Sequence, residues 1–345
     1  MSADRIVILT TEQARAQAGS DADAPALARA LRAQGADAVC IVGAADGMDW
    51  IDTPHASGWL RGAAQSRDAF AAAMQAALAR GFVPADAAIL AKMTAPHALP
   101  LLSWGERAPA SPAPSGPVRP LDLYAIVDSA ARLRQVLDAG LRTVQLRIKK
   151  PVDADAAWLE MLRHDVRQAV SDCAAAGAEL FVNDHWQVAH ALGAAGVHLG
   201  QEDLLALGDE GRSALQATGM ALGVSSHSLW ELARARTLSP RYIACGPVWP
   251  TLTKDMPWLP QGLDNLSWWV RAAGMPVTAI GGILEPQHVR EAARSGCDGV
   301  CIVRGLGADP RATLPGLRSA LAAGRSHPLS GVPDAPHPSL PPTAA

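Results

Sequence analysis

From Leu121 onward, short apolar runs alternate with longer segments in which apolar residues recur at helical spacing. The short runs have the length and flanking turn residues of buried strands, and the longer segments have the pattern of amphipathic helices. Eight strand-helix units within residues 121–325 predict an α/β fold, a (β/α)8 TIM barrel. A doubly wound open sheet fits less well, because no GxGxxG follows the first strand. The predicted strands are LDLYAIVD, TVQLRI, ELFVND, GVHLG, ALGVSSH, YIACGP, PVTAIGG and GVCIV.

Residues 1–105 carry the pattern of a smaller α/β segment. RIVILT and AVCIVGA are predicted strands, and SRDAFAAAMQAALARG is a predicted helix. A Pro-rich linker is expected at 106–118, followed by the barrel at 119–325 and a disordered tail at 326–345. The linker predicts two separately folding units with little obligatory contact.

Composition excludes several classes of protein. The formal net charge of the 345-residue chain is −3, with acids and bases interspersed, so no basic face for nucleic acid is expected. The five cysteines form no CxxC pair and are interpreted as packing residues in a reducing compartment. No leader and no apolar run of about 18 residues is found, so a cytoplasmic protein without membrane partners is expected.

Polar residues follow nearly every predicted barrel strand, at the end of the barrel where active sites lie. Arginine and lysine at this end favour a polyanion, and two carboxylates beside that anion require a cation between them. We therefore predict that Asp184 and Asp203 hold Mg²⁺ bridging to a pyrophosphate. The strand-end residues are Gln145, Arg147, Lys149, Asn183, Asp184, Gln201, Asp203, Ser225, His227, Thr251, Thr253, Lys254, Gly281 and Gly282.

The glycine pair Gly281 and Gly282 would let backbone N–H groups approach a second phosphate, at the loops after strands seven and eight of the barrel. Two anion sites indicate two phosphorylated substrates, and hence a transferase that joins them.

At this point a family resemblance becomes specific. Six motifs occur in order at matching strand ends, and residues 119–325 closely resemble thiamine phosphate synthase. The resemblance implies that hydroxymethylpyrimidine pyrophosphate is joined to 4-methyl-5-(2-phosphoethyl)thiazole, with release of pyrophosphate by a dissociative mechanism that uses Mg²⁺. The motifs are VQLRIKK, FVNDHW, GVHLGQEDL, LGVSSHS, CGPVWPTLTK and AIGGI.

The resemblance also assigns roles to residues. Lys254, Arg147 and Ser225 are the implied catalytic residues, and Asp184 and Asp203 are the implied metal ligands. Two positions depart from the family pattern: Arg304 stands where a serine is common, and Trp249 replaces Tyr or Phe. The implied substrate-binding residues are Gln145, Arg147, Lys149, Asn183, Ser225, Thr251, Thr253, Lys254, Gly281, Gly282 and Arg304.

Residues 1–105 faintly resemble the last third of hydroxymethylpyrimidine phosphate kinases. The phosphate-cradling glycines of such kinases would fall within residues 65–68, where the sequence reads QSRD, so a degenerate, inactive segment is expected.

Other interpretations stay open. Asp184 or Asp203 alone could be a helix cap, and His198 is interpreted as an inward-facing core histidine. The alternative functions are a thiazole tautomerase-like paralogue and a non-catalytic ligand-binding regulator of the thiamine pathway. The sequence does not decide between a monomer and a homo-oligomer.

Overall fold

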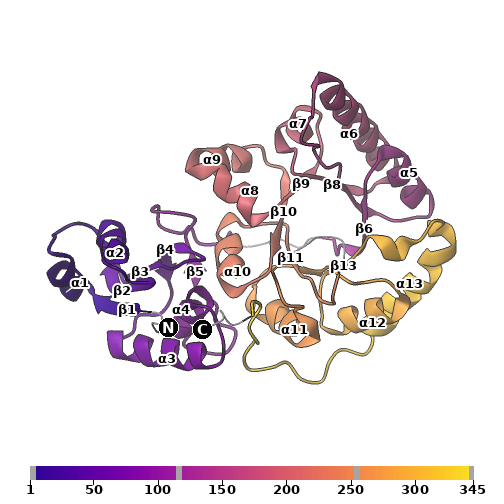
Figure 1. The fold of residues 1–345 in the computed structure, drawn as a ribbon. Coiled ribbons are helices and arrows are strands. Elements are labelled where there is room, and N and C mark those ends of the chain that lie inside the picture. Colours follow the sequence, from indigo (N-terminus) through magenta and orange to yellow (C-terminus); the bar gives the residue numbers. More distant parts are fainter. Residues whose placement is uncertain (1–4, 114–118, 252–256, 342–345) are drawn as a thin grey trace.

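A computed structural model describes residues 5–113, 119–251 and 257–341. Eight parallel strands close into one barrel, beside a smaller sheet built from the N-terminal residues (Figure 1). All eight predicted barrel strands are confirmed, and the open sheet is wrong because β13 pairs with β6 and closes the ring. The barrel strands are β6(Asp122–Val127), β7(Thr143–Leu146), β8(Glu179–Asn183), β9(Gly196–Leu199), β10(Ala221–Ser226), β11(Tyr242–Cys245), β12(Val277–Ala279) and β13(Gly299–Ile302).

Helices surround the barrel, as the apolar spacing predicts. The segment after β9 was expected as one helix but is divided at Leu207, because Gly208 has a left-handed backbone (φ 64°). The barrel helices are α5(Ala130–Asp138), α6(Ala156–Ala176), α7(Trp186–Ala191), α8(Gln201–Ala206), α9(Gly208–Ala217), α10(Leu229–Ala235), α11(Gly262–Ala272), α12(Pro286–Arg294) and α13(Pro310–Arg325), with short 3-10 helices η1(Arg236–Leu238) and η2(Arg304–Leu306).

Two layers of apolar packing hold the barrel. The outer layer lies between strands and helices, and the inner layer fills the barrel with side chains that alternate inward along the strands. The five cysteines are buried and free, which confirms their prediction as packing residues. The inner layer consists of Leu121, Tyr124, Ile126, Phe181, Tyr242, Ala244 and Cys301.

The N-terminal segment is a five-stranded sheet with four helices. The two predicted strands are confirmed as a parallel pair, and the predicted helix is confirmed as α3. Three further strands, which the pattern did not predict, add antiparallel to this pair. The elements are β1(Ile6–Thr10), β2(Ala38–Ala45), β3(Met48–Asp52), β4(Ser57–Arg61), β5(Leu101–Leu102), α1(Thr11–Ala18), α2(Ala24–Ala33), α3(Arg67–Ala79) and α4(Pro84–Lys92).

The N-terminal segment packs closely on the barrel through α10, which faces α4 and β5 (Figure 1). The buried Asp86 carboxylate accepts the Trp230 backbone N–H at 3.1 Å, where α10 begins. The buried Arg234 guanidinium donates to the Ser103 and Ser57 carbonyls, both at 3.1 Å. These buried polar contacts join the two parts of the chain more closely than the linker predicts, and whether each part folds separately stays a prediction.

The C-terminal segment also differs from its prediction. Residues 326–341 were expected to be disordered, but this stretch ties α11 to the N-terminal segment. The Ser339 carbonyl accepts the Leu259 N–H at 2.9 Å, and the Pro336 carbonyl accepts from Arg80 at 2.8 Å. His337 exchanges backbone hydrogen bonds with the buried Asn265 side chain. The Pro-rich sequence forms no helix or strand, yet its carbonyls find partners from packed elements.

The predicted linker is described in part. Residues 106–113 form neither helix nor strand, and residues 114–118 lie outside the described residues. Over the described ranges, no helix combines the length and the apolar composition that a bilayer crossing requires.

Candidate active site

The predicted chemical residues gather at the carboxyl end of the barrel. Gln145 lies in β7, with Arg147 and Lys149 directly beyond it, and Asn183 ends β8. Ser225 lies near the end of β10. Because all eight strands are parallel, these ends share one rim. Gln145 and Asn183 are buried, Arg147 and Ser225 are half-buried, and Lys149 is exposed, so the site runs from the barrel interior out to solvent.

The two predicted metal ligands lie close enough for the charge of one to act on the other. Burial and then the negative charge of Asp203 raise the pKa of the Asp184 carboxyl, whereas His185, Arg147 and a hydrogen bond from Asn183 act in the opposite direction. Asp184 makes no helix-capping bond and has a left-handed backbone (φ 63°). Such a backbone is rare for a non-glycine residue and points to a local constraint at this site.

Asp203 has a second structural function. Its Oδ2 accepts the Gly200 backbone N–H at 3.1 Å, which closes the first turn of α8. Asp203 is therefore not the N-cap itself: Gly200 is the N-cap of α8, and Asp203, at the third helical position, accepts its N–H. A carboxylate has about four lone-pair sites, so this bond leaves most of its acceptor capacity available for a cation.

The basic strand end of β7 is held by a neighbouring loop. His185 Nε2 lies 2.9 Å from the Ile148 carbonyl oxygen, between Arg147 and Lys149 in sequence, and its ring contacts Trp158 edge-on. This bond fixes the backbone that presents both cations. The sequence left His185 without a role, because partners across two loops are not visible in a strand pattern.

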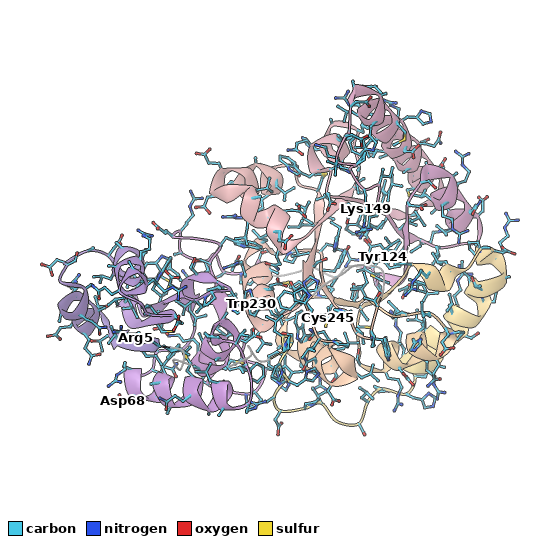
Figure 2. All side chains as sticks on the ribbon, in the orientation of Figure 1. Arg5, Asp68, Tyr124, Lys149, Trp230 and Cys245 are labelled. Atoms are coloured by element: carbon cyan, nitrogen blue, oxygen red, sulfur yellow. The ribbon has the colours of Figure 1, made fainter. Side chains whose placement is uncertain are left out.

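Residues that the sequence did not place in the site connect Gln145 to Ser225. Gln145 Nε2 donates to the Tyr124 hydroxyl at 3.2 Å, and Ser225 Oγ lies 2.8 Å from His198 Nε2. Figure 2 labels Tyr124 within the ring of barrel strands. His198 is buried and bonded on both ring nitrogens, which confirms it as an inward-facing core histidine. Burial, Arg147 and His227 lower the pKa of His198 to about 3.

The glycine loop after β12 lies against the loop after β11. The Val248 N–H donates to the Ile280 carbonyl at 2.8 Å, and the Trp249 N–H donates to the Gly281 carbonyl at 3.1 Å. Gly281 and Gly282 have left-handed backbones (φ 93° and 73°). A Cβ at Gly281 would lie 2.6 Å from the Pro247 Cα, so only glycine permits this approach.

Two of the remaining predicted residues are described by the structure, and two are not. Thr251 is half-buried in the loop between β11 and α11. Thr253 and Lys254 lie outside the described residues. Arg304 begins η2 after β13, with its side chain exposed on the rim.

Behind Ser225, buried polar groups brace the start of α10. Gln201 Nε2 donates to the Ser225 carbonyl at 3.1 Å and to Ser226 Oγ at 3.0 Å. The His227 N–H donates to Glu231 at 2.6 Å, and the His227 ring stacks on Trp258 at 5.2 Å. Gln201 and His227 therefore support the rim rather than form part of it.

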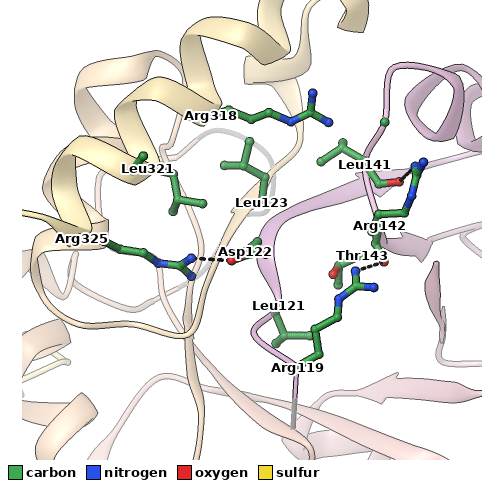
Figure 3. Close-up of a pocket in the computed structure, with 12 residues that line it drawn as sticks. Arg119, Leu121, Asp122, Leu123, Leu141, Arg142, Thr143, Arg318, Leu321 and Arg325 are labelled. Carbon is green, nitrogen blue, oxygen red and sulfur yellow. Dashed lines mark hydrogen bonds and ion pairs between the residues drawn. The ribbon is translucent and has the colours of Figure 1, made fainter. Parts of the chain in front are cut away.

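A cavity of ≈ 410 Å³ lies at the opposite, amino-terminal end of the barrel (Figure 3). Its guanidinium groups are already engaged: Arg325 pairs with Asp122, Arg119 donates to the Arg142 carbonyl, and Arg318 donates to the Ala139 carbonyl after α5. Arginines in this arrangement satisfy carbonyl groups where helices and strands meet. We assign this cavity to barrel closure and the carboxyl end to chemistry.

The carboxyl end fits a hard divalent cation. Within the described ranges, no cluster of three or more His, Cys, Asp and Glu residues could form a complete protein cage for a metal. Burial and then the charge of Asp203 raise the pKa of the Asp184 carboxyl, and a cation beside it would favour the ionised form. Two carboxylates completed by substrate oxygens are the ligand set that suits Mg²⁺.

Comparison with known proteins agrees with this geometry. The family model described as thiamine monophosphate synthase matches residues 123–306, more than half of the chain. A thiamine-phosphate synthase of Neisseria meningitidis serogroup A is 40% identical over 203 residues, covering 58% of this chain and 94% of the relative. One of Rhizobium etli is 39% identical over 206 residues, covering 59% and 96%. The solved thiamine phosphate pyrophosphorylase of Pyrococcus furiosus aligns with a TM-score of 0.50 and 28% identity, covering 59% of this chain and 96% of that one.

Proposed function

The chain belongs to the thiamine monophosphate synthase family and is a transferase of thiamine biosynthesis, and from this premise we propose how its barrel performs the condensation. The substrates are hydroxymethylpyrimidine pyrophosphate and 4-methyl-5-(2-phosphoethyl)thiazole. One observation carries the assignment of the site: Arg147, Asp184, Asp203 and Ser225 lie at or just beyond the carboxyl ends of four consecutive strands, β7 to β10, on one rim of the barrel.

The proposed binding residues divide into two groups. Gln145, Asn183 and Ser225 line the buried inner part of the rim, where a flat heterocycle can be held by directional hydrogen bonds. Arg147 and Lys149, with Lys254 and the threonines of the β11 loop, meet the pyrophosphate. The backbone of Gly281 and Gly282 and the exposed Arg304 are proposed to meet the thiazole phosphate, which is a dianion that suits N–H groups and a guanidinium.

Asp184 and Asp203 are the proposed holders of Mg²⁺. When bound there, the cation would stabilise negative charge on the leaving pyrophosphate. The raised pKa of Asp184 supports this assignment, because burial and the charge of Asp203 outweigh the opposing effects of His185, Arg147 and Asn183, and a bound cation would favour the ionised carboxylate.

The proposed reaction is dissociative. The bond between the pyrimidine methylene carbon and the pyrophosphate oxygen breaks first, and its electron pair leaves with the pyrophosphate. Arg147, Lys149 and Lys254 stabilise that developing charge, while Gln145, Asn183 and Ser225 hold the ring. The thiazole nitrogen then donates its lone pair to the methylene carbon, and the glycine loop holds the thiazole in line by its phosphate.

The N-terminal segment is proposed to have no kinase activity. At the position of the phosphate cradle, Ser66 Oγ accepts the Ala69 N–H and caps α3, and Arg67 pairs with Asp68. We propose 1–105, 106–118, 119–325 and 326–345 as the divisions of the chain, with the outer two segments supporting the barrel through α10 and α11.

The test is synthesis of thiamine phosphate by the full-length protein from both substrates and Mg²⁺, followed by mass spectrometry. Asp184→Asn and Asp203→Asn should each lower turnover by roughly a hundredfold or more, since an amide supplies no charge for the cation. Calorimetric titration with Mg²⁺ and inorganic pyrophosphate should show weakened metal binding in both variants. Glu202→Gln is the matched control, because it removes an exposed carboxylate from the same turn of α8. Normal turnover of both Asn variants at limiting Mg²⁺ would contradict the metal assignment.

A further inference from the structure

A continuous chain of hydrogen bonds crosses the interior of the barrel and joins two of the proposed substrate residues. Gln145 Nε2 donates to Tyr124 Oη at 3.2 Å, and the Tyr124 and Tyr242 hydroxyls lie 2.7 Å apart. Tyr242 Oη lies 2.8 Å from His198 Nδ1, and His198 Nε2 lies 2.8 Å from Ser225 Oγ. The chain runs from β7 through β6, β11 and β9 to β10, so it spans the barrel rather than following its wall.

The chain is shielded from solvent. Tyr124 and Tyr242 are 0% exposed, Gln145 is 2% exposed and His198 is 6% exposed. The Phe181 ring contacts both tyrosine rings, and the His198 ring stacks on Tyr242. In such surroundings a polar group that loses its partner is costly, so each proton must have a defined acceptor.

The protonation state of each member is defined by its burial. Burial raises the pKa of both tyrosine hydroxyls well above 10, so each hydroxyl keeps its proton. Burial lowers the pKa of His198 to about 3, so its ring is neutral and carries one N–H.

Counting protons then gives the chain one direction. Gln145 Nε2 is a donor and cannot accept, so among the described contacts the Tyr242 oxygen is the acceptor for the Tyr124 proton. The Tyr242 proton is therefore donated to His198 Nδ1, which places the ring proton on Nε2. His198 Nε2–H donates to Ser225 Oγ, and the Ser225 hydroxyl proton remains available for a partner in the active site.

We propose that Tyr124, Tyr242 and His198 are positioning residues that hold Ser225 as a hydrogen-bond donor toward an acceptor atom of the pyrimidine substrate. The inference rests on the proposed contact between Ser225 and that substrate. A site that offers only a donor here accepts a ligand with a matching lone pair and disfavours one without it, because a buried polar group would be left unpaired.

Two glycines make room for the rings of this hydrogen-bond chain and for the Phe181 ring packed on it. A Cβ at Gly223 would lie 2.3 Å from Tyr242 Cζ, so the strand that carries Ser225 needs glycine two residues earlier, on the same inward face. A Cβ at Gly196 would lie 2.7 Å from the Phe181 ring, on the strand that carries His198. Glycine on each strand thus leaves space for an aromatic ring, Tyr242 beside Gly223 and Phe181 beside Gly196.

The experiment is a double-mutant cycle on full-length protein with Tyr242→Phe and Ser225→Ala, with KM and kcat measured for each substrate. Tyr242→Phe removes one oxygen and breaks the chain, and we expect kcat/KM for the pyrimidine substrate to fall roughly tenfold, the value of one hydrogen bond. The thiazole KM should stay unchanged. In the Ser225→Ala background the same substitution should change kcat/KM less than twofold, because the chain then has nothing to position.

Two further variants keep the test independent of folding. His198→Gln can keep an N–H near the Nε2 position and should recover most of the activity that His198→Ala loses. Thr278→Val is the matched control: it removes a buried barrel hydroxyl for which the described residues offer no hydrogen-bond partner, and kcat/KM should not change.

The outcomes separate the two claims. Full activity of Ser225→Ala would overturn the proposed substrate contact of Ser225, and with it the positioning of that contact. A loss in Ser225→Ala together with additive losses in the double variant would overturn only the positioning chain. Equal losses for both substrates, with a lowered melting temperature, would also overturn it by assigning Tyr242 a purely structural role.

Discussion

Asp86 offers a sharp test of how the N-terminal segment is joined to the barrel. It is 1% exposed and lies where α4, the first turn of α10 and the C-terminal segment meet. Burial raises the pKa of its carboxyl from 3.8 to about 7. Hydrogen bonds from the Trp230 and Leu229 N–H groups lower the pKa by less, and the nearby Glu231 adds a smaller upward shift. We predict that Asp86→Asn removes a pH dependence of stability that the wild-type protein has.

The sign and size follow from linkage. Between pH 3.8 and about 7 the folded protein keeps a proton on Asp86 that the unfolded chain releases. This stabilisation is complete below pH 3.8 and is lost as the pH rises through 7. At 1.36 kcal/mol for each pKa unit, Asp86 should lower the free energy of unfolding by roughly 2–3 kcal/mol between pH 5 and pH 8. The neutral Asn side chain keeps a carbonyl oxygen for the Trp230 N–H and does not titrate.

The assay is urea unfolding followed by tryptophan fluorescence at pH 5, 6, 7 and 8. As the pH rises from 5 to 8, the unfolding free energy of the wild-type protein should fall relative to that of Asp86→Asn, because only the wild-type side chain titrates. Asp23→Asn is the matched control, since Asp23 also accepts an N–H at a helix N-terminus but is exposed. Parallel pH curves for wild type and Asp86→Asn would refute the reasoning.

Three further predictions concern packing. Lys92→Met should lower the unfolding free energy in urea by roughly 3–5 kcal/mol, because it leaves Asp49 buried without its 2.7 Å ion partner; the double variant with Asp49→Leu should recover most of that loss. Gly282→Ala should raise the KM for the thiazole phosphate, because the new Cβ would lie 2.5 Å from the Trp249 Cβ. Gly193→Ala is the control, because the space around Gly193 is open: it should lower the unfolding free energy by about 1–2 kcal/mol through left-handed backbone strain and leave KM unchanged. A protein of residues 119–345 should melt roughly 5 °C or more below the full-length protein and lose activity, because it lacks the contacts between α10 and the N-terminal segment. Equal melting temperatures would contradict this.

The eight barrel strands and the rim residues could be predicted from the sequence because both depend on local regularities. A buried parallel strand needs a short apolar run, and a residue such as Asp184, directly after that run, must lie at the carboxyl end. The antiparallel β3 and β4 escaped prediction because MDWID and SGWLR are short, mix polar with apolar residues, and become strands by pairing with β2.

The C-terminal segment shows the limit of composition. Its proline content argues against helix and strand, and none forms over residues 326–341, the part that the structure describes. Composition says nothing, however, about which groups donate hydrogen bonds to its carbonyls or accept them from its N–H groups. Asn265 and Arg80, which are distant in sequence, supply hydrogen bonds that order this stretch.

Hydrogen-bond partners across the molecule were decided only by the tertiary structure. Asp86 and Trp230 are 144 positions apart, and Tyr124 and Tyr242 are 118 apart. Their strands and helices follow from spacing, but which hydroxyl meets which ring depends on barrel closure and on the glycines that make room. The sequence by itself therefore determined the strands and the chemistry at their ends, because those patterns repeat over a few residues. The hydrogen-bond chain from Gln145 to Ser225 and the contacts of the N-terminal segment with α10 were decided by the tertiary structure. They form only because packing brings distant groups within hydrogen-bond distance and excludes water from around them.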